Sequence, residues 1–309
     1  MSLGSLLWLT ACSTSTTSPS PSPAPAETSP DNPPKLQGQA IRFGVLAIDS
    51  AVSANERYRP LLDYLETEIG RPFELVPLSQ TSQFTEVEAG NLDFTTNNPL
   101  AAVQLRRLYN TKFLVTHTRP QTGTEFSGLI VVRADSDIQT LEDLRGKRIA
   151  CVNFQTAAAG CVFQIYHLLQ AQINPATDFA SFVENPSQDN IVLAVLNHSI
   201  DAGFIRTGQL EKMVEKGLIQ GQDALRILEP MADDFAYTHT TALYPEWPIA
   251  ALPETDPELA AQVREALLKL PPDHPALKPA KVAGFVPSVS YTELDDLIET
   301  LQLKSWEAP

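Results

Sequence analysis

The chain has 309 residues, 43% of which are hydrophobic, and it carries a formal net charge of −15. This length is enough for one large domain or for two lobes. The acidic charge argues against nucleic acid as a partner, but it does not exclude an anionic ligand, because a single pocket can be locally positive. No apolar run reaches the roughly 18 residues that a membrane-spanning helix needs.

The first 35 residues indicate export. A short apolar stretch, 3–9, precedes Leu-Thr-Ala and Cys12, and this order resembles a bacterial lipobox, in which the cysteine is lipidated. We therefore expect 1–12 to be a lipoprotein signal peptide, although no Lys or Arg precedes the stretch; the alternative is a chance cysteine in a tail. Residues 13–35, rich in Ser, Thr and Pro, are expected to form a disordered tether. Such a chain is exported and held at the membrane surface by its lipid anchor.

Strand and helix patterns alternate through the next part of the chain. The expected elements are strand 41–46, a helix capped by Ser53 or Asn55 that ends before Gly70, strand 73–78, a short helix near 84–89, strand 92–96, helix 99–109 and strand 112–118. This alternation predicts βαβ units and a mostly parallel sheet. Ligands of such sheets bind beyond the carboxyl ends of the strands, which here are 47–53, 95–98 and 118–119.

A second series with the same alternation follows. Its expected elements are strand 126–133, a helical turn at 138–144, strand 148–152, a helix through 162–169, strand 180–184, a helix from Ser187 or Asp189 to Asn197, strand 201–205, helix 209–216, strand 225–228, an extended segment 235–243, helix 257–270 and helix 290–301, with Ser290 and Glu293 as a capping box. The fold class is therefore α/β with two lobes, one formed by 36–130 plus 240–309 and the other by 131–239. Segments 126–133 and 235–243 would cross between them.

The segment 147–172 contains the clearest candidate for a binding turn. An apolar strand leads through a small, polar stretch, 153–160, into a helix start. Unpaired N–H groups at a helix start and the helix dipole both favour an anion. The alternative is an ordinary turn between a strand and a helix.

The ordered set of motifs resembles a known family, the phosphate/phosphite/phosphonate-type substrate-binding proteins of ABC transporters, over residues 41 to about 303. The motifs that carry this resemblance are 41–45, 58–61, 93–94, 141–147, 194–196 and 201–203. Segments 204–208 and 242–248 resemble the extracytoplasmic sensor domains of tetrathionate-sensor-like histidine kinases, which share the fold. The resemblance implies a type II periplasmic binding fold with a ligand cleft between two lobes.

The resemblance also implies the site residues. These are Tyr58, Thr95, Thr96, Asn97, Asn98, Arg119, Gln155, Thr156, Ala157, Ala158, Asp189, Arg206 and Tyr244. Where the family's phosphonate loop is rich in Ser, Thr and Gly, this chain has alanine at 157–159. Backbone N–H donors remain there, and the side-chain donors are Gln155 and Thr156.

Each group has an alternative interpretation. Residues 95–98 could form a helix cap and an Asx turn. Arg119 and Arg206 follow strands and could grip an oxyanion with two hydrogen bonds, or could form surface ion pairs. Tyr58 would face either the core or the cleft. Asp189 matches a carboxylate that meets an amine in phosphonate binders, or it caps a helix, and Tyr244 lies on a crossover near the cleft.

Cys151 and Cys161 remain once Cys12 is assigned to the lipid anchor. Export permits a disulfide between them. Two buried thiols, or two reactive thiols, are the alternatives, because spacing alone does not give the distance between their Cα atoms.

The sequence predicts a binding protein and no enzyme. It lacks a nucleophile elbow, a P-loop and a dinucleotide-binding motif, and its five histidines show no metal-ligand spacing. We expect no cofactor and no metal. The predicted function is that of a monomeric lipoprotein that closes its lobes over a small, phosphate- or phosphonate-like anion and delivers it to an ABC permease. The alternative is a stand-alone sensor that signals to a partner histidine kinase.

Overall fold

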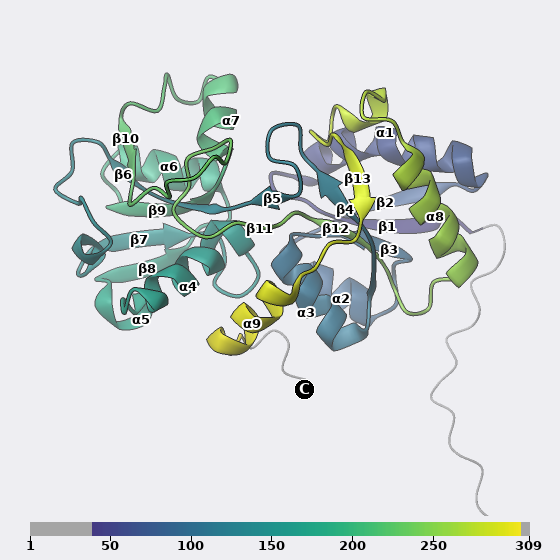
Figure 1. Cartoon of the computed structure of the whole chain (residues 1–309), viewed down its shortest axis with the longest axis horizontal. Helices are drawn as coiled ribbons and strands as arrows, with labels where there is room; N and C mark the ends of the chain where they lie inside the picture. The colour runs from purple at the N-terminus through teal and green to yellow at the C-terminus, as the bar shows by residue number, and fades with distance from the viewer. Residues whose placement is uncertain (1–38, 304–309) are drawn as a thin grey trace, which may run out of the picture. The chain divides into compact units, whose positions relative to one another are not determined.

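The computed structural model describes residues 39–303, so the predictions for Cys12 and for segments 1–12 and 13–35 lie outside the described residues. Three β-sheets form within the described part, with six, five and two strands (Figure 1). We call the part built on the six-stranded sheet lobe 1 and the part built on the five-stranded sheet lobe 2.

The sheet of lobe 1 has the strand order β13-β4-β12-β3-β1-β2. Its strands are β1 (Ile41–Leu46), β2 (Phe73–Leu78), β3 (Phe94–Thr96), β4 (Lys112–Thr118), β12 (Pro248–Ala251) and β13 (Gly284–Pro287). Strand β1 is parallel to β2 and β3, whereas β12 is antiparallel to β3 and β4, and β13 is antiparallel to β4. The four strands on which the expectation of a parallel sheet rested, β1 to β4, do run in one direction, but β12 and β13, which were not predicted as strands, run opposite to them and make the sheet mixed.

The sheet of lobe 2 has the order β10-β6-β9-β7-β8. Its strands are β6 (Gly128–Arg133), β7 (Arg148–Cys151), β8 (Ser181–Glu184), β9 (Ala202–Arg206) and β10 (Leu225–Ile227). Strand β7 is parallel to β8 and β9, while β6 and β10 run antiparallel to their neighbours.

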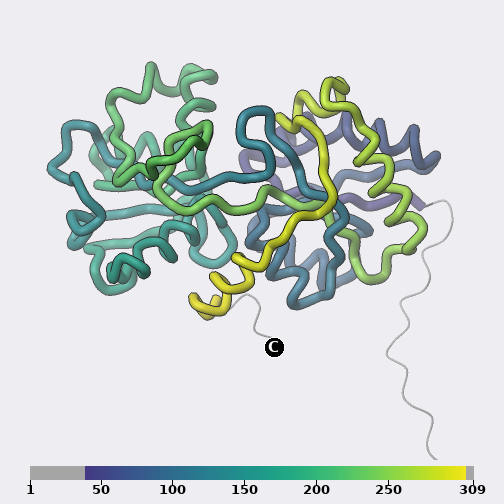
Figure 2. The backbone as a smooth tube through the Cα atoms, in the orientation of Figure 1, coloured from purple at the N-terminus to yellow at the C-terminus, as the bar shows by residue number. Residues whose placement is uncertain are grey.

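Two backbone segments connect the lobes (Figure 2). They pair as β5 (Glu125–Phe126) and β11 (Tyr244–Pro245), which are antiparallel. The segment 235–243, expected to be extended, forms bends instead of a strand. A short two-stranded ribbon between two sheets is the kind of connection at which hinge motion concentrates.

Helices cover both faces of each large sheet. In lobe 1, α1 and α8 lie on one face and α2 and α3 on the other; in lobe 2, α6 and α7 lie opposite α4 and α5 (Figure 1). The α-helices are α1 (Ala51–Ile69), α2 (Ser82–Glu88), α3 (Pro99–Tyr109), α4 (Phe163–Gln170), α5 (Pro175–Asp178), α6 (Gln188–Leu196), α7 (Gln209–Glu215), α8 (Pro257–Lys269) and α9 (Thr292–Leu301). The 3-10 helices are η1 (Glu142–Leu144) and η3 (Pro275–Leu277), and η2 (Ala158–Val162) is a π-helix that continues into α4.

Helix α1 begins earlier than its sequence suggested. Ser50 caps it, and the hydroxyl of Ser50 accepts a hydrogen bond from the Ser53 N–H at 3.0 Å. The predicted caps Ser53 and Asn55 are therefore wrong, because both residues lie inside the helix. Gly70 ends the helix as expected, in the left-handed region at φ 73°, which glycine adopts without steric cost.

Helix α9 contacts elements of both lobes. Its buried residues Leu294, Leu297 and Ile298 belong to the same hydrophobic cluster as the core of lobe 2, and Arg106 of α3 pairs with Asp295 at 2.6 Å. The capping box predicted for Ser290 and Glu293 is wrong. The N-cap residue of α9 is Tyr291, and its side chain makes no capping hydrogen bond.

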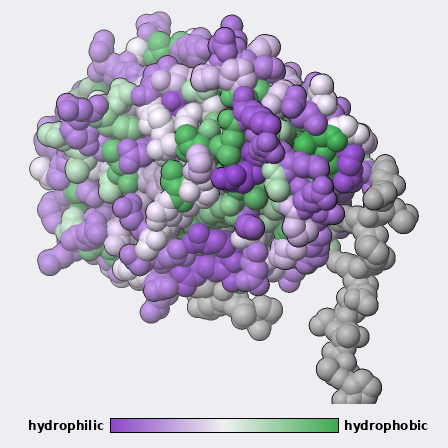
Figure 3. Space-filling model, turned by 45° about the vertical axis from the view of Figure 1, so that its right-hand side comes forward, coloured by the Kyte–Doolittle hydropathy of each residue, from purple (hydrophilic) through white to green (hydrophobic). Residues whose placement is uncertain are grey.

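Separate hydrophobic clusters lie on the two faces of the lobe 1 sheet. The face of the molecule in Figure 3 is mostly hydrophilic, with apolar residues interspersed. The carboxyl ends of β1, β2 and β3 face the lobe 2 loops that follow β7 and β9. The candidate site lies between these strand ends and these loops.

Candidate functional site

A cavity of about 530 Å³ lies between the lobes. Lobe 1 supplies the loop after β1, the loop after β2 and Asn98, and lobe 2 supplies the loop after β7, the start of α6 and Arg206. We call it cavity 1. Its lining residues are Leu46, Ala47, Ile48, Asp49, Ser79, Gln80, Thr81, Asn98, Phe126, Val152, Ala157, Ala158, Ala159, Gly160, Pro186, Ser187, Gln188, Asp189, Arg206, Gln209, Lys216 and Trp247.

A second cavity, of about 740 Å³, adjoins the first, and we call it cavity 2. Ile48, Phe126, Arg206 and Trp247 line both cavities, so these four side chains form their common wall. Cavity 2 extends towards α7 on lobe 2 and towards the segment between α8 and β13 on lobe 1.

Four consecutive backbone N–H groups at the start of η2 are free donors. Those of residues 158–161 make no hydrogen bond to another described residue, and residues 157–160 line cavity 1. Because η2 continues into α4, these donors stand at the amino end of a continuous helical segment, where the helix dipole favours negative charge. This loop can bind an anion through its backbone, as the alanine run at 157–159 implied.

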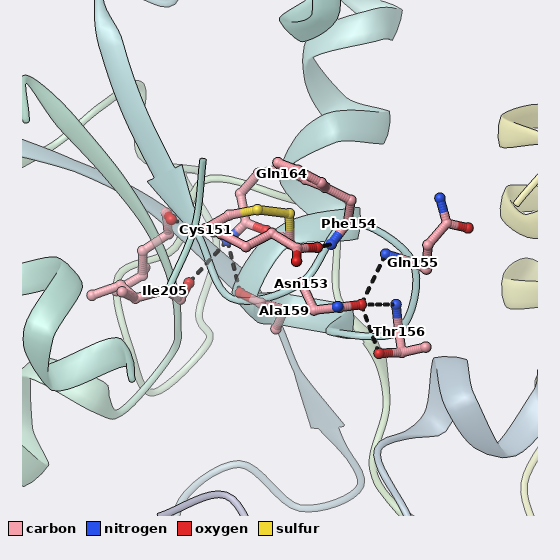
Figure 4. The surroundings of a disulfide bond; sticks show 11 residues. Cys151, Asn153, Phe154, Gln155, Thr156, Ala159, Gln164 and Ile205 are labelled. Carbon is pink, nitrogen blue, oxygen red and sulfur yellow. Dashed lines mark hydrogen bonds between the residues drawn. A yellow bond between two sulfur atoms is a disulfide. The ribbon is translucent and has the colours of Figure 1, made fainter. Parts of the chain in front are cut away.

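Two features hold this loop in place. A disulfide joins Cys151 at the end of β7 to Cys161, with the two Cα atoms 5.0 Å apart. The buried Nε2 of Gln164 donates to the carbonyl oxygens of Leu129, Ala159 and Ile205 at 3.1, 2.7 and 2.9 Å. Figure 4 shows the disulfide and Gln164 on the same side of the loop. The loop is thus fixed covalently to its own sheet and by hydrogen bonds to β6 and β9.

Arg206 is the cation of the common wall. It ends β9, and its backbone N–H donates to Gln188 Oε1 at 2.9 Å. Its buried Nε has no hydrogen-bond partner, and no carboxylate of a described residue forms an ion pair with it. Burial lowers the pKa of Arg206, and the nearby Arg119 lowers it further. A guanidinium remains charged in a protein, so Arg206 is a half-buried charge, with its Nε fully buried, that lacks a counterion among the described residues.

Arg119, in contrast, already has a counterion. Its guanidinium lies 3.1 Å from Glu246, whose side chain is 3% exposed, and also donates to the carbonyl oxygens of Ala280 and Lys281 at 3.2 Å. Burial lowers the pKa of Arg119, but Glu246 and Tyr58 outweigh this effect and raise it. Arg119 lines cavity 2 but not cavity 1.

Three of the four polar residues predicted at the end of β3 lie away from the cavities. Thr95 Oγ1 donates to Asn97 Oδ1 at 2.6 Å, Thr96 Oγ1 donates to the Pro248 carbonyl at 3.0 Å, and Asn97 Nδ2 donates to Gln83 Oε1 at 2.7 Å. All three are buried, and none lines either cavity. Their hydrogen-bonding groups hold lobe 1 together.

Asn98, Gln155 and Thr156 connect the lobes to each other. Asn98 Nδ2 donates to the Thr156 carbonyl at 2.8 Å, and Gln104 Nε2 donates to the Gln155 carbonyl at 2.9 Å. The Thr156 hydroxyl donates to Gln80 Oε1 at 2.8 Å. Of the three predicted residues, Asn98 also lines cavity 1. These three hydrogen bonds each join a residue of lobe 1 to a residue of lobe 2, and so they hold the lobes in contact.

Two ion pairs also join the lobes, and each has one partner in α7 of lobe 2. Lys212 lies 2.9 Å from Asp49, and Lys281 lies 2.7 Å from Glu215. The second pair is well exposed and contributes little to stability on its own.

The remaining predicted residues differ in position. Asp189 lines cavity 1, where Gln209 Nε2 donates to it, and it does not cap α6, because Ser187 does. Tyr58 is buried in lobe 1 beside Arg119 and lines neither cavity. Tyr244 stacks on Phe163 with ring centroids 3.9 Å apart, and burial raises its pKa. It too lines neither cavity.

Several cavity residues were missed by the sequence analysis. Asp49 lies within 47–53, one of the strand ends at which ligands were expected to bind. Trp247 lies within 242–248, one of the segments that resemble sensor domains. The sequence therefore offered a reason to include both among the candidate site residues. Lys216 had none, because it lies beyond the end of a helix with no motif around it.

Within residues 39–303, no group of three or more His, Cys, Asp or Glu side chains could hold a metal ion. No helix in the same range combines the length and hydrophobicity that a membrane span requires.

Comparison with known proteins identifies a family model and a curated relative that match this sequence. A family model described as "ABC transporter, phosphonate, periplasmic substrate-binding protein" matches residues 43–290. The tetrathionate sensor histidine kinase TtrS of Salmonella typhimurium is 29% identical over 234 residues, which are 74% of this chain and 39% of that kinase. The chain thus spans less than half the length of this curated relative.

Two solved structures show the same fold. PhnD1 from Prochlorococcus marinus, in complex with methylphosphonate, has a TM-score of 0.69 and 15% identity, covering 86% of this chain and 99% of that one. A binding protein component of an ABC phosphonate transporter from Pseudomonas aeruginosa has a TM-score of 0.70 and 16% identity, covering 87% and 86%. The prediction of an α/β, two-lobed type II periplasmic binding fold is confirmed.

Proposed function

Because this chain belongs to the family of periplasmic substrate-binding proteins of phosphonate ABC transporters, we propose that it binds a small oxyanion between its lobes and delivers it to an ABC permease. The observation that carries the proposal is Arg206, a half-buried arginine whose buried Nε has no partner among the described residues. It lines the same cavity as residues 157–160, next to the four free N–H groups of 158–161.

Electrostatics favour an anion in this place. Burying an uncompensated charge costs several kcal/mol, so a protein retains one where a counterion is to be bound. Backbone N–H groups and a guanidinium together match the oxygens of a phosphonate, sulfonate or phosphate group. Asp49 and Asp189 line the same cavity and would orient any positive or hydrogen-bond-donating part of the ligand.

Lobe closure is the proposed mechanism. A ligand that contacts Arg206 and the η2 loop on lobe 2 together with Asn98 on lobe 1 makes all of its contacts only when the lobes are together. It therefore shifts the population towards the closed state, in which the β5–β11 ribbon provides the connection about which the lobes move.

Calorimetric titration with phosphate, methylphosphonate, methanesulfonate and thiosulfate tests the proposal. We expect Arg206→Gln to weaken binding of the anion that binds by roughly 10- to 100-fold, the worth of a hydrogen bond to a charged group. The control is Arg148→Gln, which removes the same charge from an exposed pair of lobe 2 at the far end of the sheet.

A stability measurement separates binding from folding. Since Arg206 lacks a counterion, Arg206→Gln should unfold at the same or a higher temperature than the wild type when no ligand is present. Heat from no anion, or equal weakening by the two substitutions, would contradict the proposed site.

A second candidate function is sensing. The 29% identity with a tetrathionate sensor histidine kinase, over 74% of this chain, supports a domain that reports its ligand to a kinase instead of a permease. Cross-linking of the protein at the surface of its own cells, with identification of the partner, distinguishes the two: a permease subunit supports transport, and a kinase supports sensing.

The lipid anchor at Cys12 is also part of the proposal, with 13–35 as the tether that lets the domain reach its partner. Incorporation of labelled palmitate into the wild type but not into Cys12→Ser is the measurement that tests it.

A further inference from the structure

The two cavities meet at the unpaired guanidinium of Arg206. Cavity 1 is lined by residues 158–160, which carry three of the four free N–H donors of the η2 loop. Cavity 2, on the other side, is larger, at about 740 Å³. Together they offer far more room than an anion with a single charged group would fill.

Cavity 2 is cationic in its own right. It is lined by six Lys and Arg side chains against four carboxylates. Three of the six, Arg119, Lys212 and Lys281, already form ion pairs. Arg206, Arg57 and Lys278 form no ion pair with a described residue, against two carboxylates, Glu211 and Asp273, that form none either, so the unpaired groups leave an excess of one positive charge. Arg57 is close enough to Arg206 to lower its pKa, so the two guanidinium groups repel each other when no anion lies between or beside them.

The common wall itself is mostly apolar. Apart from Arg206 it consists of Ile48, Phe126 and Trp247, of which Phe126 and Trp247 are 5% and 6% exposed. A ligand that reaches from one cavity into the other passes these side chains, and an apolar or sulfur-containing linker loses no hydrogen bonds there.

We propose that the ligand is an elongated dianion with one oxyanionic group at each end, joined by a short linker without hydrogen-bonding groups. One end binds in cavity 1, to the N–H groups of 158–160 and to Arg206, and the other binds in cavity 2, to Arg57. This inference rests on the proposed anion-binding function and specifies the class of ligand.

Titration with matched one-headed and two-headed anions tests the inference. The probes are methanesulfonate against ethane-1,2-disulfonate and butane-1,4-disulfonate, methylphosphonate against ethane-1,2-diphosphonate, and tetrathionate, which has a sulfonate at each end. We expect the best two-headed probe to bind at least about tenfold more tightly than its one-headed partner, with a stoichiometry of one.

Arg57→Gln isolates the second end. Arg57 is partly exposed, its hydrogen bond to the Ala280 carbonyl is long at 3.5 Å, and its guanidinium lies 5.7 Å from the centre of the Tyr58 ring, so the substitution removes only weak contacts and should leave the fold intact. It should reduce the affinity for the two-headed probe to that of the one-headed probe and leave the one-headed probe unaffected. Arg264→Gln, on the exposed face of α8 and away from both cavities, controls for the change in net charge.

The outcomes separate this inference from the function on which it rests. One-headed probes that bind as tightly as two-headed ones, a stoichiometry of two, or an Arg57→Gln variant that weakens both classes equally would overturn the two-headed ligand and leave anion binding standing. If neither class binds, both proposals fall together.

Discussion

The disulfide between Cys151 and Cys161 holds the loop that presents the four N–H donors, and its removal is the perturbation with the clearest expected size. The bond joins residues 10 positions apart. The chain-entropy relation for a loop of that length gives about 2.7 kcal/mol at 25 °C. For a chain of this size that corresponds to a melting temperature roughly 4 to 5 °C lower.

The assay compares thermal unfolding of the wild type, of the wild type in excess reductant, and of the double variant Cys151→Ala/Cys161→Ala. Reduction keeps every side chain and removes the cross-link, so it isolates the entropic effect from the smaller volume of alanine. Both treatments should lower the melting temperature by a similar amount, and reductant should not change the double variant further. Complete reduction, shown by alkylation of both thiols, without a measurable shift would refute the reasoning.

Two further predictions concern the buried groups of lobe 1. Glu246→Gln leaves the Arg119 guanidinium without its carboxylate and should lower the free energy of unfolding in urea by about 3 to 5 kcal/mol. Replacing both partners should lower it by less. An equal loss for the single and double variants would argue against a penalty for an unpaired charge. Burial of His117, whose two ring nitrogens have no partner among the described residues, holds its pKa well below the usual 6.5. The unfolded chain therefore binds the proton more readily than the folded one. The contribution of neutral His117 to the free energy of unfolding should be fully present above pH 6.5 and fall by up to about 1.4 kcal/mol per pH unit below it. A His117→Leu variant that loses the same free energy of unfolding between pH 7 and pH 5 would rule this group out.

The sequence predicted elements whose signal is local. The helix ending at Gly70 and the helix starting at Pro99 appear as expected, since a left-handed glycine and a first-turn proline act on their own neighbours. Strands β12 and β13 were missed because each is four residues long and contains a proline at one end. They become strands through pairing with β4, a contact between residues more than 130 positions apart that no local pattern reveals.

The same limit applied to the cysteines. Their spacing left a disulfide, buried thiols and reactive thiols open, because the distance between two Cα atoms depends on how the turn between them folds. In the structure the Val152 N–H donates to the Gly160 carbonyl at 2.9 Å, which brings the end of β7 back to the start of the helical segment. That hydrogen bond joins the two residues next to the cysteines, and the Cα atoms of Cys151 and Cys161 lie 5.0 Å apart.

Arg119 and Arg206 looked alike in sequence, since each follows a strand at the ligand edge of a sheet. What distinguishes them is Glu246, which lies 127 positions after Arg119 and reaches it through the strand pairing of lobe 1. Glu246 neutralises Arg119, but it forms no ion pair with Arg206, although its charge still raises the pKa of Arg206. A strand-end arginine is therefore available to a ligand only if the fold brings no carboxylate to it, and by that criterion Arg206, not Arg119, is the residue on which anion binding should depend.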